Sequence, residues 1–226
     1  MTLKRIIPAL VIAPLLVCNL AAASDVADAV MKKDWQAVRA LLQKKADVNA
    51  AQVDGSTALL WAVHWDNTEI ADLLIRAGAD VKAAARTGGT PMEQAAVNGN
   101  AVILEKLLNA GAPIDAPLTM YGDTALMIAS RTGKPEAVKV LLDHGANVNA
   151  KEKWGNTTAL MYATQEHHKE AVQLLASRGA DVKARSKIVP APKSGGGADR
   201  AEAPRDPKPG EKPTSDRKST RLNSSH

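Results

Sequence analysis

Gly-Ala-Asp-Val-Lys-Ala, at residues 78–83, is the stretch that decides the fold, because close copies of it return at residues 111–116, 145–150 and 179–184. The intervals between copies are 33, 34 and 34 residues, and a threonine precedes the first glycine of each copy by 21 residues. A period near 33 residues indicates stacked copies of one structural unit, none of which can form a core alone. Such a stack presents an extended surface, which favours binding over catalysis in an enclosed pocket.

One unit, at residues 57–78, is predicted to form two short helices joined by a turn. Thr57 is a candidate N-cap, residues 66–68 separate the helices, and Gly78 is the residue type that most often ends a helix in the left-handed conformation. The expected buried positions are Leu59, Trp61 and Ala62 in the first helix and Ile70, Leu73 and Leu74 in the second. Neither helix reaches the roughly 12–15 residues that an isolated helix needs in water, so each unit depends on its neighbours.

These features resemble the ankyrin repeat. The resemblance rests on the helix starts at residues 55–59, 89–92, 122–126 and 158–160, and on the closing turns, of which residues 145–150 are the best preserved. It implies an all-α solenoid of helix-turn-helix units with β-hairpin fingers between them. The expected repeat domain is 24–185, with units at about 24–50, 51–83, 84–116, 117–150 and 151–184. The first unit has charged residues at several of the repeat's apolar positions, as a solvated capping repeat should.

The first 23 residues are predicted to be a secretory signal. Lys4 and Arg5 form a basic start, residues 6–20 are apolar, and three alanines precede Ser24. An uncleaved anchor is the alternative, but the apolar run is shorter than the roughly 20 residues of a membrane span and contains two prolines. A lipoprotein signal at Cys18 is a second alternative. We therefore expect a periplasmic or secreted protein with no stable membrane insertion after cleavage.

The composition changes after the last repeat. Residues 186–215 are rich in Pro and Gly, which predicts a disordered linker or an insertion loop. Residues 216–226 look like the in-frame translation of a widely used sequencing adapter, and we interpret them as an artefact. The sequence is then expected to be cut off near residue 215, and the natural chain is expected to continue into further repeats.

Charge and motif content exclude several function classes. Residues 24–185 carry 18 Lys and Arg against 19 Asp and Glu, so the formal charge of +5 arises outside the repeats and gives no reason to expect nucleic-acid binding. The only cysteine is Cys18, inside the signal. The sequence contains no phosphate-binding loop, no zinc-protease motif and no serine-protease ordering, and His167 and His168 are interpreted as turn residues. We expect no cofactor, no metal and no enzymatic activity.

The resemblance implies a protein–protein interaction module, here of an exported bacterial protein. In the family, partners bind to the finger tips and to the exposed side of the first helix, on the concave face. Carried over by position, the candidate partner-binding residues are Asp54, His64, Trp65, Arg86, Asn98, Tyr121, Arg131, Trp154 and Glu166. Trp65 is expected to point outward and Trp61 inward. Two alternatives are an immunity or inhibitor protein for an exported enzyme, and the targeting or regulatory part of a longer exported enzyme.

Overall fold

The computed structural model describes residues 24–187, and these residues form ten short helices. The helices are α1 (Asp25–Met31), α2 (Trp35–Gln43), α3 (Ala58–His64), α4 (Thr68–Arg76), α5 (Pro91–Asn98), α6 (Ala101–Asn109), α7 (Ala125–Thr132), α8 (Pro135–Asp143), α9 (Ala159–Gln165) and α10 (Lys169–Ser177). This arrangement confirms the predicted all-α repeat solenoid. The predicted signal, and all but the first two residues of the predicted linker and terminal segment, lie outside the described residues.

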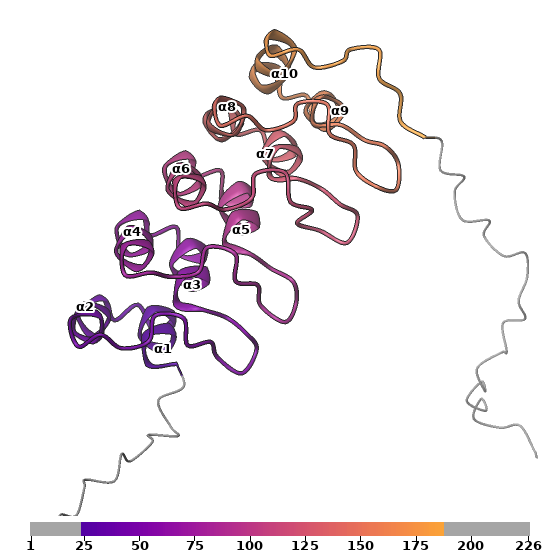
Figure 1. The fold of residues 1–226 in the computed structure, drawn as a ribbon. Coiled ribbons are helices and arrows are strands. Elements are labelled where there is room, and N and C mark those ends of the chain that lie inside the picture. The colour runs from indigo at the N-terminus through magenta and orange to yellow at the C-terminus, as the bar shows by residue number, and fades with distance from the viewer. Residues whose placement is uncertain (1–23, 188–226) are drawn as a thin grey trace, which may run out of the picture. The chain divides into compact units, whose positions relative to one another are not determined.

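The helices lie in two layers (Figure 1). The odd-numbered helices pack against one another along one layer, from α1 to α9, and α4, α6, α8 and α10 pack against one another in the second. Each odd helix also packs against the even helix that follows it. None of the helices between residues 24 and 187 has the length and apolar character needed to cross a bilayer.

A threonine caps each of four first helices. The side-chain oxygens of Thr57, Thr90, Thr124 and Thr158 accept a hydrogen bond from the backbone N–H three residues later. Such a cap satisfies one of the unpaired N–H groups at a helix start and is worth about 1 kcal/mol. The recurring threonine therefore fixes where each first helix begins.

The core combines alanines and some larger side chains in the first layer with long aliphatic side chains in the second. Alanines such as Ala62, Ala95 and Ala129 have no exposed surface, which allows the odd helices to approach closely. The second helices contribute the long aliphatic side chains, and the fully buried ones include Ile70, Leu74, Ile103, Leu104, Leu107, Leu141 and Leu175. Because these side chains fill the space between successive units, no unit is stable alone.

Finger-shaped turns connect the units and extend past the layer of odd helices (Figure 1). Backbone hydrogen bonds close them, such as that from the Leu118 N–H to the Asp123 carbonyl at 2.8 Å, but none of residues 24–187 forms a β-strand. Neighbouring fingers also bond to each other, since the Arg86 N–H donates to the Asp54 carbonyl at 2.8 Å. At this contact Gly55 is required, because its φ is +83° and a Cβ would come within 2.9 Å of the Arg86 nitrogen.

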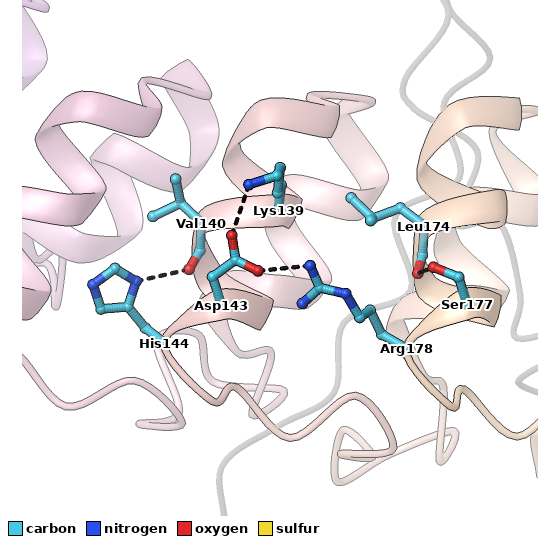
Figure 2. Close-up of polar contacts among 7 residues, drawn as sticks. All are labelled: Lys139, Val140, Asp143, His144, Leu174, Ser177 and Arg178. Atoms are coloured by element: carbon cyan, nitrogen blue, oxygen red, sulfur yellow. Dashed lines mark hydrogen bonds and ion pairs between the residues drawn. The ribbon is translucent and has the colours of Figure 1, made fainter.

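Ion pairs connect successive units across the second layer. Asp143 on α8 accepts from Lys139 of its own helix at 2.8 Å and from Arg178, just after α10, at 2.6 Å (Figure 2). Hydrogen bonds from these two cations lower the pKa of the Asp143 carboxyl. Equivalent cross-unit pairs join Arg39 to Glu69 and Lys106 to Asp72. The Arg39–Glu69 pair is exposed and adds little stability, whereas the Lys106–Asp72 pair is partly buried; all of these pairs favour one alignment of neighbouring units.

The last helix pair has a less covered outer side than the pair before it. Leu126, Met127 and Ile128 on α7 are buried, whereas their counterparts on α9, Leu160, Met161 and Tyr162, are partly exposed. On α10, Leu175 is buried, Leu174 is partly exposed and Ala176 is exposed. Apolar side chains that earlier units cover are therefore open to solvent here.

Candidate partner-binding surface

The face formed by the odd helices and the fingers, which we call the finger face, carries hollows between successive units, and two of these hollows contain aromatic residues. The N-terminal hollow, of about 330 Å³, is lined by residues that include Trp61, His64, Thr87, Glu93, Gln94 and Val97. The C-terminal hollow, of about 320 Å³, is lined by Tyr121, Asp123, Arg131, Glu152, Trp154, Gly155, Thr157 and Tyr162. Both hollows are open to solvent, so they suit side chains of a partner better than an enclosed small molecule.

Two exposed aromatic rings stack at the rim of the C-terminal hollow. Tyr121 and Trp154 lie on neighbouring fingers, with ring centroids 5.6 Å apart and ring planes at 13°. The exposed fraction is 47% for Tyr121 and 60% for Trp154, although large aromatic side chains are mostly buried in proteins. The Lys153 N–H donates to the Tyr121 carbonyl at 2.8 Å and so couples the two fingers. The stack is therefore a preformed apolar surface.

A buried carboxylate holds the loop that carries Trp154. Glu152 is 4% exposed, and its oxygens accept backbone N–H groups of Trp154 and Gly155 at 2.5 Å and of Thr157 at 2.9 Å. Burial by itself raises the pKa of the Glu152 carboxyl, but the hydrogen bonds from Thr157, Trp154 and Gly155 outweigh it and lower the pKa overall. The ionised carboxylate thus stabilises the conformation of the finger.

A hydrogen bond between two units forms the floor of the same hollow. The Tyr162 hydroxyl on α9 donates a hydrogen bond to the Asp123 carboxylate at 3.0 Å. Asp123 is buried, with an exposed fraction of 2%. The Thr119 hydroxyl donates to the other oxygen of Asp123 at 2.9 Å. Burial, and then the bond to Asp123, raise the pKa of Tyr162 to about 12. The Arg131 guanidinium lies 5.5 Å from the centre of the Tyr162 ring, which gives the hollow one exposed cation.

An aromatic cluster lies beside the N-terminal hollow, and it corrects one expectation. Trp61 and Trp65 are both partly buried and stack on each other, with centroids 6.0 Å apart. The Lys33 ammonium lies 3.8 Å from the Trp65 ring centre, and the Trp65 indole nitrogen is buried. Trp65 therefore does not point outward, because Lys33 of the preceding unit and Trp61 cover it. Trp61 is the one that lines the hollow, and its indole N–H donates to Gln52 at 2.6 Å.

The N-terminal hollow also contains a carboxylate that sequence reasoning did not select. Glu93 is the third residue of α5, a position occupied by Leu60, Met127 and Met161 in three other units. Burial raises the pKa of the Glu93 carboxyl, and the negative charge of Asp123 raises it further. A hydrogen bond from the Thr90 backbone N–H has an opposing effect that is smaller than that of burial. No Lys or Arg among residues 24–187 forms an ion pair with it. An acidic residue at a position that is otherwise apolar was the available signal.

The remaining candidate residues are distributed over the finger face. Tyr121, Arg131 and Trp154 come together at the C-terminal hollow, and exposed His64 lines the N-terminal one. Asp54 and Arg86 are exposed at the finger tips and line a third, more open hollow. The Asn98 amide instead donates to the Val63 carbonyl at 2.8 Å and joins two units. Glu166 is exposed and lines none of these hollows.

The described residues contain no group of three or more His, Cys, Asp or Glu side chains placed to hold a metal ion. His168, at the turn before α10, bonds through its Nε2 to the Arg131 backbone carbonyl at 3.0 Å. This contact joins two units, so the histidine has a structural role.

Comparison with protein families identifies the fold. A family model for ankyrin repeats, in three copies, matches residues 26–117 and 94–186. The chain belongs to the ankyrin repeat family. No curated protein matches it. Ankyrin repeats are generally protein–protein interaction modules and typically have no catalytic activity, and the two solvent-open hollows of this ankyrin repeat chain are compatible with that role.

Proposed function

We propose that this chain is the protein-interaction module of an exported ankyrin repeat protein and that it binds its partner through the finger face. The basic and apolar start of the sequence supports export to the periplasm or the exterior.

The observation that carries the proposal is the exposed Tyr121–Trp154 stack. Tryptophan and tyrosine are among the residues that contribute most to interface energies, because they bury a large area at a small cost in side-chain entropy. Glu152 and the bond between the two fingers hold this stack in place before any partner arrives. Preorganisation of this kind removes part of the entropic cost of binding.

Affinity capture from the periplasm and culture medium of a Gram-negative host tests the proposal. The baits are the wild-type chain, the double variant Tyr121→Ala/Trp154→Ala, and the control Val102→Ala. Val102 is 50% exposed on α6, in the opposite layer, so it reports on general surface stickiness. We expect a protein that the wild type and the control retain and the double variant loses. Equal retention by all three baits would contradict the proposal.

A further inference from the structure

The N-terminal hollow combines an aromatic ring with hydrogen-bond acceptors. The Trp61 indole and the His64 ring lie nearly perpendicular, with centroids 5.6 Å apart, and both line the hollow. The Glu93 carboxylate lines it from α5, together with Gln94. A tryptophan face and a carboxylate together attract a cation, the ring through its quadrupole and the carboxylate through its charge.

Two residues that line the hollow, Glu93 and Gln94, have acceptor oxygens that can take further hydrogen bonds. Gln94 uses its amide nitrogen to donate to Asn98 at 2.9 Å, and within residues 24–187 its amide oxygen accepts no hydrogen bond. Glu93 has no cationic partner in the same range, and Asp123 adds negative charge nearby. An anion would be repelled here, and an apolar side chain would leave the Gln94 oxygen without a donor and the Glu93 charge without a cation. A group with several N–H donors and a positive charge matches the site.

We propose that the N-terminal hollow accepts a lysine or arginine side chain of the partner protein. The inference rests on the proposed function and adds the chemistry of the partner: a basic side chain in this hollow, with the Tyr121–Trp154 stack forming a separate, apolar contact. Desolvation of the Glu93 carboxylate then destabilises the free protein, and an ion pair with the basic side chain of the partner offsets this cost on binding.

Peptide titration followed by NMR tests this inference without the natural partner. The probes are the blocked pentapeptides Gly-Gly-Lys-Gly-Gly and Gly-Gly-Arg-Gly-Gly, with Gln and Glu versions as references. We expect saturable shifts of the Trp61 indole N–H with the Lys and Arg peptides at millimolar concentration, and no saturation with the Gln or Glu peptides. Saturable binding of the Gln or Glu peptide, or no binding of either basic peptide, would overturn the inference.

Matched variants separate a binding role of Glu93 from a role in capping α5. Glu93→Gln should weaken binding of the basic peptides at least about tenfold, because it removes the charge and keeps the shape. Glu105→Gln removes the same charge from an exposed position on α6 and should leave the affinity unchanged. The melting temperature is the second readout: a binding carboxylate predicts that Glu93→Gln melts no lower than wild type. A clear fall in melting temperature with unchanged peptide affinity would assign Glu93 to the helix cap and refute the inference.

Failure of the basic side chain to bind can be distinguished from failure of the proposed function. Loss of partner capture by Tyr121→Ala/Trp154→Ala tests the finger face as a whole, whereas the peptide titration tests the hollow alone. Capture that depends on the aromatic stack, with no binding of basic peptides, would retain the proposed function and reject the basic partner residue.

Discussion

The hydroxyl of Tyr162 donates to the buried carboxylate of Asp123 at 3.0 Å and joins α9 to the finger of the preceding unit. Tyr162→Phe removes this donor and leaves the carboxylate with one partner fewer in a desolvated position. We expect the free energy of unfolding to fall by about 1–2 kcal/mol in urea titration. Tyr121→Phe is the control, because the Tyr121 ring is exposed, and it should stay within about 0.5 kcal/mol. Equal stability of wild type and Tyr162→Phe would contradict the assigned role.

The same bond predicts a pH dependence in alkali. The pKa of Tyr162 is raised to about 12 in the folded protein from an ordinary value of 10, so the folded state holds the proton more tightly than the unfolded state does. The stabilisation is complete below pH 10 and is lost as the pH rises from 10 to 12. The difference in unfolding free energy between wild type and Tyr162→Phe should therefore shrink over this interval. A constant difference would show that Tyr162 does not titrate as expected.

Glu152→Gln is expected to loosen the finger that carries Trp154. An amide offers a single acceptor oxygen, so it cannot accept all three backbone N–H groups that the carboxylate holds. We expect increased hydrogen exchange at the amides of Trp154, Gly155 and Thr157 and a loss of stability of about 1 kcal/mol. Glu166→Gln, at an exposed position, is the matched control. Unchanged exchange at these three amides would refute the role of Glu152.

Acid should have a related effect on the finger. The pKa of Glu152 is lowered in the folded protein, so its contribution is present above the ordinary pKa of 4.5 and is lost as the pH falls through the lowered value. Protection of the Trp154 amide in the wild type should therefore decline in this acid range. In Glu152→Gln the protection should show no such decline, and a parallel decline in both proteins would point to another group.

The two tryptophan variants Trp65→Ala and Trp154→Ala should differ in stability. Trp65 packs against the core, Trp61 and Lys33, so its truncation should cost about 2 kcal/mol. Trp154 is 60% exposed, and its truncation should stay within about 0.5 kcal/mol. Thermal melts of the two variants measure this difference. A larger loss for Trp154→Ala would mean that the stack is mainly structural.

The repeat period was sufficient to predict the fold, because Thr57 and its counterparts cap helices at the expected positions, and the glycines of the closing turns follow the helix ends. The surface was harder to predict. The position of a residue within the repeat predicts the direction of its side chain from its own helix, but not its neighbours from other units. Lys33, which belongs to the preceding unit, covers Trp65. Glu93 was passed over because an acidic residue in the first turn of a helix is ordinary by itself. The departure from the apolar residues at this position in three other units is the sequence signal, and the hollow around Glu93 makes it a candidate.

Calorimetric titration with the purified partner measures how much the Tyr121–Trp154 stack contributes to binding, which we expect to be the largest share of any contact on the finger face. We predict that Trp154→Ala weakens binding at least about tenfold while its melting temperature stays at the wild-type value, and that Val102→Ala binds like wild type. Unchanged affinity of Trp154→Ala, or an equal loss in Val102→Ala, would show that the stack is not the main contact with the partner.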